Sequence, residues 1–152
     1  MSSYARTFEL RWSDGDANGH IRHSVYAELG AETRIGWLAE RGFPWKRLEE
    51  LGVSLVLLRE ELSYRRELGI GERVRLDLRV LGLSPDAARW KILHDLTRED
   101  GSLAAQIVAS GGWIDLGRRR LVAPPAEIAA VLLAAERAQG FEELPPLSRR
   151  ES

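Results

Sequence analysis

The strongest constraint on the fold is a series of strand-like segments in the second half of the chain. They are residues 53–66, 74–80, 90–96 and 103–116. In residues 74–80 every second side chain is Val or Leu and those between are charged, a pattern typical of a strand with one buried face. Asp100-Gly101 predicts a tight hairpin, and Gly111-Gly112 predicts a bulge or sharp bend. Together these segments predict an antiparallel sheet with one face in the core.

A long helix is predicted before this series. Ser24 is a suitable N-cap, and the helix is expected to run to about Arg41, where Gly42 and Pro44 stop it. Helical spacing relates four residues on one face: Tyr26, Leu29, Thr33 and Trp37. Gly30 and Gly36 each cost about 1 kcal/mol relative to alanine within a helix, so we expect another part of the molecule to pack very close to it.

The remaining segments complete an α+β pattern. Residues 7–12 alternate as a first strand, residues 13–20 form a loop, and residues 45–51 form a short amphipathic helix. Pro124-Pro125 open a terminal helix with an apolar stripe at Ile128, Val131, Leu132 and Ala135. We expect one long helix against an antiparallel sheet, in a single domain of residues 1–141 followed by a polar tail at 142–152.

Composition excludes several classes of protein. A length of 152 residues suits one domain. Without cysteine there is no disulfide, thiolate metal site or thiol nucleophile. No apolar run approaches the roughly 20 residues of a membrane span, and the N-terminus lacks the apolar core of a signal peptide. We therefore expect a soluble cytoplasmic protein that does not act at a membrane. The net charge of -1 argues against broad nucleic-acid binding.

Most of the candidate chemistry lies between Asp14 and His23, where two carboxylates and two imidazoles fall within ten residues. Residues 14–19 match the start of a calcium-binding EF-hand loop, but the twelfth position is Val25 instead of the required Glu. The ligand types also suit zinc or iron, through Asp14, Asp16, His20 and His23. No fixed helical face holds the two histidines together, however.

Two interpretations of this segment that involve no metal remain open. Asp, Asn and Gly are the residues that a tight strand-to-helix connection uses, so the cluster could be turns and caps alone. Alternatively, a helix that begins near Ser24 presents unpaired N–H groups that could hold a developing oxyanion. A carboxylate on the facing loop could then attack a carbonyl or activate water. No serine-nucleophile motif is present, since Val108 stands where the first Gly before Ser110 is needed.

Residues 11–34 resemble the opening of the 4-hydroxybenzoyl-CoA thioesterase-like branch of the hotdog-fold superfamily. The shared pattern is Arg11-x-x-Asp14-x-Asp16-x-x-Gly19-His20, then Tyr26, then Glu32-x-Arg34. The resemblance continues more loosely through Gly71-Glu72, Asp100-Gly101 and Pro124-Pro125, so it covers nearly the whole chain. It implies a long central helix wrapped by a curved antiparallel sheet. It also implies homodimers or homotetramers joined edge to edge, with the active site at the subunit interface.

The same resemblance implies the roles of individual residues in an acyl-CoA thioesterase that needs no cofactor or metal. Asp16 would be the catalytic general base or nucleophile, and the His23 backbone amide would be the oxyanion donor, with a catalytic or orienting role for the His23 side chain in some members. Substrate binding is assigned to Gly19, His20, Tyr26 and Trp12, the last standing where one subgroup has tyrosine. The substrate would be an acyl-CoA or an acylated carrier protein.

Other residues and other functions stay open at this point. Asp14 is expected to brace the loop, and His94 to be a satisfied core or interface histidine. Glu32 could face the pocket or pair with an arginine of the helix. Arg118–Arg120 could meet the phosphates of CoA or be a solvated charge run. A hotdog protein that binds acyl-CoA without hydrolysis, a dehydratase on the same fold and a metal-dependent enzyme are the rival functions.

Overall fold

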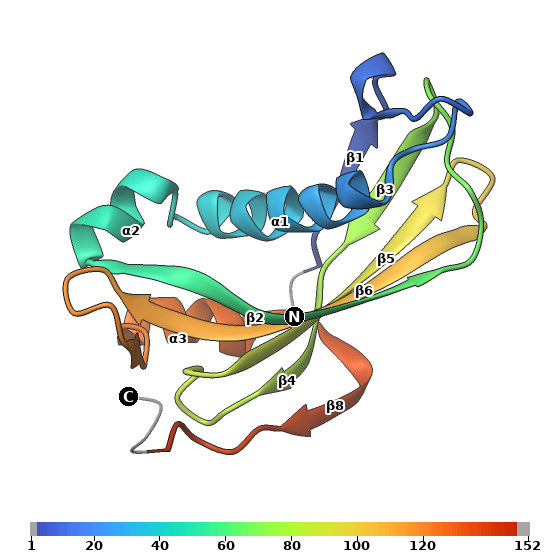
Figure 1. Cartoon of the computed structure of the whole chain (residues 1–152). Coiled ribbons are helices and arrows are strands. Elements are labelled where there is room, and N and C mark those ends of the chain that lie inside the picture. The colour runs from blue at the N-terminus through green and yellow to red at the C-terminus, as the bar shows by residue number, and fades with distance from the viewer. Residues whose placement is uncertain (1–2, 149–152) are drawn as a thin grey trace.

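Residues 3–148 are described by the computed structural model, in which a long helix crosses one face of a curved sheet (Figure 1). The elements in chain order are β1 (Ala5–Glu9), the short 3-10 turn η1 (Trp12–Asp14), α1 (His23–Glu40), α2 (Trp45–Leu51), β2 (Val53–Tyr64), β3 (Arg73–Asp77), β4 (Arg79–Leu83), β5 (Trp90–Arg98), β6 (Leu103–Asp115), β7 (Leu121–Val122), α3 (Ala126–Ala134) and β8 (Arg137–Glu143). This order confirms the predicted α+β class, with one long helix against a largely antiparallel sheet.

The sheet is built around the antiparallel strands β2, β6 and β5. Beyond β5 it divides, because β5 pairs with β3 along one part of its length and with β4 along another. β1 extends the sheet from β3, and β8 extends it from β4 as a parallel strand. Within residues 3–148, β2 pairs with β6 alone, so its other side is an open sheet edge.

The predicted alternation of residues 74–80 is confirmed, but the segment forms two strands instead of one. Val74, Leu76, Leu78 and Val80 are all buried, as expected. The strand is interrupted at Leu78 because the carboxylate of Asp77 accepts the backbone N–H of Asp95 at 2.7 Å. A side chain thus replaces a ladder hydrogen bond, and the sheet bends between β3 and β4.

The glycine pair of β6 marks the irregularity that the sequence predicted there. Leu57 pairs with Gly111, but the next ladder pair joins Arg59 to Ser110, so the extra residue of the bulge lies on β2. A Cβ atom on Gly111 would lie 1.9 Å from the backbone oxygen of Val56. Only glycine therefore allows β2 and β6 to approach this closely.

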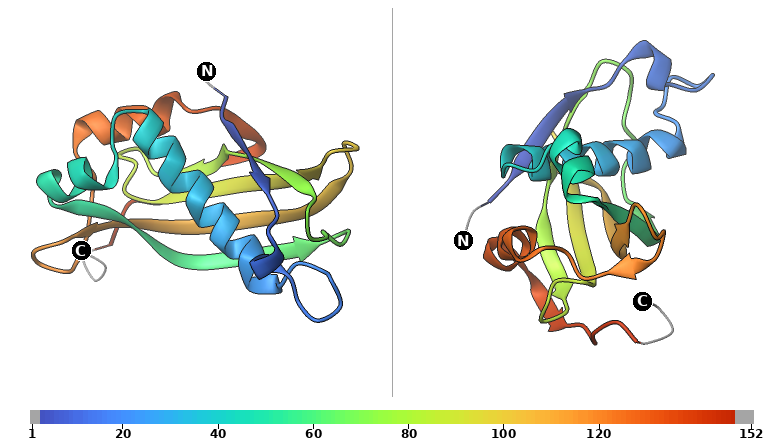
Figure 2. Two further views of the ribbon diagram at one scale, coloured as in Figure 1. Left: turned by 90° about the horizontal axis from the view of Figure 1, so that it is seen from above. Right: turned by 90° about the vertical axis from the view of Figure 1, so that its left-hand side faces the viewer.

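Seen from above, α1 runs obliquely across the sheet (Figure 2). Its buried residues are Val25, Tyr26, Gly30, Thr33, Arg34, Trp37 and Leu38. The expected close packing is present at both glycines. A Cβ on Gly30 would meet Ile107 Cδ1 at 3.1 Å and Arg34 Nη1 at 3.3 Å, and one on Gly36 would meet the Tyr4 hydroxyl at 2.9 Å.

Two expectations about the N-terminal half need correction. The helix begins at His23, with Arg22 as its N-cap, so Ser24 is already inside the helix. Its start is fixed by the backbone N–H of Arg22, which donates to the Asp14 carbonyl at 2.9 Å. The first strand ends at Glu9 and does not continue to Trp12, because the chain turns into η1 and leaves Trp12 84% exposed.

The C-terminal half contains the expected helix and one unexpected strand. Ile128 and Leu132 of α3 are buried, and Ala135 lies buried just after it. The sequence did not predict β8, and the expected tail at 142–152 begins inside this strand, since Glu142 pairs with Gly82. Residues 149–152 lie outside the described part. Among the described helices, none combines the length and apolarity that crossing a bilayer requires.

Candidate functional site

The loop between β1 and α1 is braced from within by Asp14. Its carboxylate is buried and accepts the backbone N–H of Arg11 at 2.8 Å and the Arg11 guanidinium at 3.0 Å. The hydrogen bond from the Arg11 side chain is the main reason that the pKa of Asp14 lies below its ordinary value. Its position agrees with the bracing role expected for Asp14, because both of its carboxylate oxygens are occupied.

Asp16 is exposed, and its carboxylate holds a tight turn with one oxygen. Oδ1 accepts the backbone N–H groups of Asn18 at 2.9 Å and of His20 at 3.1 Å. Gly19 allows the turn because its φ is +79°, in the left-handed region. No hydrogen bond to Asp16 Oδ2 is found within residues 3–148, so the second oxygen can meet water or a ligand. The same residue thus holds the turn with one oxygen and keeps the other free of hydrogen bonds within the described residues.

The first turn of α1 presents unpaired backbone donors next to this loop. The N–H of Val25 donates to the Arg22 carbonyl at 3.0 Å, whereas those of His23 and Ser24 find no acceptor in the described part of the chain. Neither does any side chain cap this helix start. Unpaired N–H groups at a helix N-terminus carry partial positive charge and attract an oxyanion.

A cleft of about 430 Å³ joins the loop to the start of α1. Its lining residues are Asp16, Asn18, His20, Ile21, His23, Tyr26, Tyr64, Arg65, Arg66 and Glu67, and we call it the Asp16 cleft. Three rings form an aromatic wall, since Tyr64 lies 5.1 Å from the His23 ring and 5.0 Å from the Tyr26 ring between centroids. The cleft therefore combines an exposed carboxylate, apolar ring surface and several charged groups.

The six residues that the sequence pointed to are only partly brought together. Asp16, His20, His23 and Tyr26 line the cleft. Gly19 shapes the loop between two lining residues without lining the cleft itself. Trp12 is exposed in η1 and belongs to no wall of this cleft. In this chain, any contact of Trp12 with a ligand in the cleft would need the ligand or a second copy to reach η1.

Two of the predicted side chains have defined neighbours. His20 Nε2 lies 3.0 Å from Glu67 Oε2, which ties the loop to the segment after β2. Tyr26 is buried, and burial is the main reason that its pKa lies above the ordinary value for tyrosine. Its phenol therefore stays protonated at neutral pH and could donate a hydrogen bond towards the cleft.

The metal interpretation finds no geometric support in the described residues. The four candidate ligands have separate neighbours: Asp14 pairs with Arg11, His20 with Glu67, Asp16 bonds within its own turn, and the His23 ring packs near Tyr64. No group of three or more histidine and carboxylate side chains in residues 3–148 could hold one ion.

The sequence did not single out the wall formed by residues 64–67. Tyr64, Arg65, Arg66 and Glu67 lie about forty residues after the Asp16 loop, and the pairing of β2 with β6 places them beside the start of α1. A polar Tyr-Arg-Arg-Glu run at the end of a strand is the one local signal that could have indicated them.

A second polar group lies under the middle of α1 and is closed to solvent. Arg34 Nη1 lies 3.2 Å from His94 Nε2, and His94 Nδ1 lies 2.7 Å from the Asp77 carbonyl oxygen. Burial is the main cause that lowers the pKa of His94 to about 4, so the ring is neutral. Because the guanidinium can only donate, Nδ1 carries the ring proton. Glu60 Oε2 lies 4.0 Å from Arg34 Nη2, and we call Arg34, His94 and Glu60 the mid-helix cluster.

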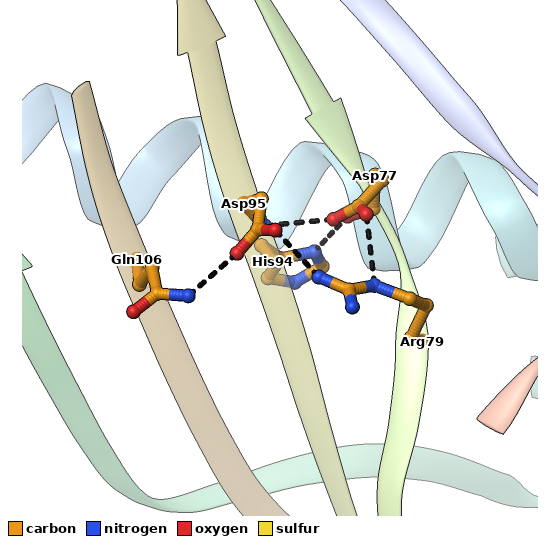
Figure 3. Close-up of polar contacts among 5 residues, drawn as sticks. All are labelled: Asp77, Arg79, His94, Asp95 and Gln106. Carbon is orange, nitrogen blue, oxygen red and sulfur yellow. Dashed lines mark hydrogen bonds and ion pairs between the residues drawn. The ribbon is translucent and has the colours of Figure 1, made fainter. Parts of the chain in front are cut away.

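The bond from His94 to Asp77 adjoins an ion-pair network on β3, β4, β5 and β6 (Figure 3). Arg79 bridges the carboxylates of Asp77 at 2.9 Å and Asp95 at 2.6 Å, and Gln106 donates to Asp95 at 2.8 Å. Each of these side chains has a protein partner. His94 is therefore a satisfied core histidine, as expected.

Comparison with known proteins identifies the family of this chain. Residues 10–132 match the family model of the thioesterase-like superfamily. A protein of Aquifex aeolicus described as a putative esterase is 30% identical over 59 residues, which are 39% of this chain and 46% of that protein. The chain thus aligns with less than half the length of that relative.

Solved structures share the fold at low sequence identity. A Staphylococcus aureus protein in complex with CoA superposes with a TM-score of 0.81 at 22% identity, covering 97% of this chain and 89% of that one. A 1,4-dihydroxy-2-naphthoyl-CoA thioesterase from Synechocystis superposes with a TM-score of 0.78 at 16% identity, covering 88% and 97%. These likenesses confirm the expected hotdog fold, and the family match over residues 10–132 shows that this chain belongs to the thioesterase-like superfamily.

Proposed function

We propose that this protein hydrolyses acyl-CoA thioesters to a free acid and CoA, with Asp16 as the catalytic carboxylate. One observation carries the proposal: one cleft is lined both by Asp16, whose Oδ2 has no hydrogen bond within residues 3–148, and by His23, whose backbone N–H finds no acceptor there. Thioester hydrolysis needs these two elements, a group that delivers an oxygen nucleophile and donors that stabilise the oxyanion. The CoA-bound neighbour and the CoA thioesterase neighbour support this substrate class.

The chemical step has two balanced forms. As a general base, Asp16 Oδ2 accepts a proton from water while the water oxygen bonds to the carbonyl carbon. The C–S bond then breaks, the thiolate leaves, and the proton passes to it or to solvent. As a nucleophile, Asp16 Oδ2 forms a mixed anhydride with release of the thiolate, and water hydrolyses the anhydride in a second step. In both forms the N–H of His23 donates to the carbonyl oxygen as it becomes negative.

The test is thiol release from a panel of acyl-CoA esters by the wild type and by Asp16→Asn, in the presence of a chelator. Asn keeps a side-chain oxygen for the turn but can neither accept the proton nor form the anhydride. We expect kcat to fall by about 10² to 10⁴, the usual contribution of a positioned acid–base group. Asp100→Asn is the matched control, because Asp100 also accepts a backbone N–H, that of Ser102 at 2.9 Å, in a turn outside the cleft.

The outcomes separate the rival functions. If the wild type is folded and releases thiol from no CoA ester, an acylated carrier protein is the next substrate to test, and binding without turnover then defines the binding-protein alternative. If Asp16→Asn and Asp100→Asn have the same activity as the wild type, Asp16 is a turn residue and the catalytic assignment fails. Activity lost only in the chelator would favour a metal-dependent enzyme.

The proposal includes a homo-oligomer joined along the open edge of β2, in the cytoplasm. That edge exposes Leu57 at 44%, Leu58 at 61% and Tyr64 at 48%, which is apolar surface that a second copy would cover. Symmetric pairing of two identical strands is antiparallel, so it would bring the β6–β7 hairpin of the partner, with Arg118–Arg120, towards the Asp16 cleft. Those arginines could then meet CoA phosphates. Light scattering should show a dimer or tetramer that Leu57→Lys with Leu58→Lys reduces to monomers.

A further inference from the structure

Two exposed arginines line the Asp16 cleft, and Arg66 has a charged neighbour, Asp100, whose pKa it helps to lower. Arg65 and Arg66 follow β2 directly, and their backbone N–H groups both donate to the Ala104 carbonyl, at 2.8 and 3.0 Å. Their backbone is therefore fixed by the sheet, although their side chains are exposed. Neither guanidinium makes a hydrogen bond or an ion pair with any residue of the described range 3–148.

The carboxylates of the cleft do not balance these charges. Glu67 Oε2 lies 3.0 Å from His20 Nε2, and Asp16 uses Oδ1 for its own turn. Just outside the cleft, Arg98 is paired with Glu72 at 3.1 Å, which shows that nearby arginines do find acidic partners in this fold. The cleft thus holds two guanidinium groups that are available to a negatively charged ligand.

We propose that Arg65 and Arg66 bind an anionic group carried by the thioester substrate. This inference rests on the proposed function and adds a substrate property to it. A guanidinium presents a planar set of donors that fits the oxygens of a carboxylate or a phosphate. The aromatic wall of His23, Tyr26 and Tyr64 supplies apolar surface for the acyl carbons between the reacting carbonyl and that anion. The anion is either a carboxylate at the far end of the acyl group or a phosphate of the thiol carrier.

Four substrates separate the two sources of the anion. Hexanoyl and adipyl thioesters have acyl groups of the same length, but only adipyl ends in a carboxylate. Each acyl group is presented both as the CoA ester and as the N-acetylcysteamine ester, which has no phosphate. The double variant Arg65→Gln/Arg66→Gln is compared with the wild type on all four. The control is Arg73→Gln/Arg75→Gln, which removes the same charge from two exposed residues of β3 outside the cleft.

If the arginines bind an acyl carboxylate, kcat/KM of the double variant falls about 10- to 100-fold for both adipyl esters, the value of one or two charge-assisted hydrogen bonds. Both hexanoyl esters then keep the wild-type value within about twofold. If the arginines bind carrier phosphate, the same fall occurs for both CoA esters and for neither N-acetylcysteamine ester. The control variant stays near the wild type in both cases. Arg65→Lys/Arg66→Lys keeps the charge and should retain part of the selectivity.

Three results would overturn the inference. The first is a double variant that matches the control on all four substrates. The second is an equal fall on all four, since that would indicate a structural role or a role in the chemical step. The third is a wild type that turns over all four esters with the same kcat/KM, because neither the acyl carboxylate nor the carrier phosphate would then contribute to binding. A wild type with no turnover of any ester instead contradicts the proposed function, so the two failures are distinct.

Discussion

The helix α1 carries two polar regions that differ in almost every physical respect. At its start, the Asp16 cleft is open, and Asp16, His20 and His23 are all exposed. Eleven residues further along, or about 16 Å at the helical rise, Arg34 is 5% exposed and His94 is fully buried. The open region has charged groups and N–H donors without protein partners. The closed region has its arginine and histidine hydrogen bonded to each other.

The two regions thus differ in exposure and in the hydrogen bonding of their histidine and arginine, and not in the types of residue present. Both regions contain a histidine, a carboxylate and an arginine. In the mid-helix cluster the imidazole is neutral and both of its nitrogens are occupied, so it cannot exchange protons at neutral pH. In the cleft, Asp16 Oδ2 and the His23 N–H are open to a ligand. Substitutions should therefore affect stability in one region and catalysis in the other.

The largest effect on stability is expected from Arg34→Met. Removing a buried charge leaves its partners unpaired, here the Nε2 atom of His94 and the carboxylate of Glu60, of which Oε2 is already buried without a hydrogen bond in the described residues. We expect the free energy of unfolding to fall by about 3 kcal/mol, at the lower end for such pairs because Glu60 retains some exposure. Urea unfolding monitored by tryptophan fluorescence measures it.

The same variant also tests whether the two regions have separate roles, one in stability and one in catalysis. If Arg34→Met folds at low temperature, its kcat should stay within a few-fold of the wild-type value. Asp16→Asn should change the free energy of unfolding by less than about 0.5 kcal/mol. Adding Glu60→Gln to Arg34→Met should restore part of the lost stability, because it removes the unpaired charge. A folded Arg34→Met that is as stable as the wild type but inactive would contradict the division between the two regions.

A smaller effect on the free energy of unfolding is expected when the pH falls, because His94 becomes protonated in the unfolded chain first. The pKa of its ring falls from 6.5 to about 4 on folding, so between these values the unfolded chain binds the proton and the folded protein does not. Its contribution to stability is therefore complete above pH 6.5 and is lost as the pH falls towards 4. Linkage gives a loss of about 2 kcal/mol between pH 7 and pH 5. His94→Gln should be less stable at pH 7 and should lack this part of the slope, and an unchanged slope would show that other groups cause it.

The smallest effect, on both stability and activity, is expected from His20→Ala in the Asp16 cleft. The pair of His20 with Glu67 is half exposed, and such surface pairs contribute about 0 to 1 kcal/mol. We expect the free energy of unfolding to change by less than about 1 kcal/mol and kcat/KM by less than about fivefold. Glu67→Gln should behave alike. A loss of activity comparable with that of Asp16→Asn would show that His20 takes part in the chemical step.

Sequence reasoning succeeded where the determining interactions are local. The alternation at residues 74–80 and the hairpin at Asp100-Gly101 depend on neighbours in the chain. The hairpin joins β5 to β6 as expected, and the alternating residues are buried as expected, although in two strands. The expectation that the first strand reaches Trp12 was wrong. The alternation continues to Trp12 in the sequence, but the hydrogen bond between Arg11 and Asp14 turns the backbone away from the strand. The sequence also contained the catalytic candidates of the loop, which is a continuous segment.

The features that the sequence did not predict depend on contacts between distant segments. Tyr64 and the two arginines after it reach the cleft only through the register of β2 on β6, which no local pattern encodes. β8 was missed because its seven residues include Gly140, with a φ of +87°, and mostly polar side chains. Its stability comes from pairing with β4, nearly sixty residues earlier. The roles of the cleft residues remain predictions, since position alone does not establish catalysis.

The unpaired N–H groups at the start of α1 also make the site observable without an assay. An amide that lacks an acceptor exchanges its hydrogen with solvent at a rate close to that of an unfolded peptide, whereas later amides of the same helix are protected by their own hydrogen bonds. His23 and Ser24 are thus natural reporters in the wild-type sequence. A ligand whose oxygen accepts from these groups would slow their exchange and leave the interior of the helix unchanged, so occupancy could be followed amide by amide without altering the sequence.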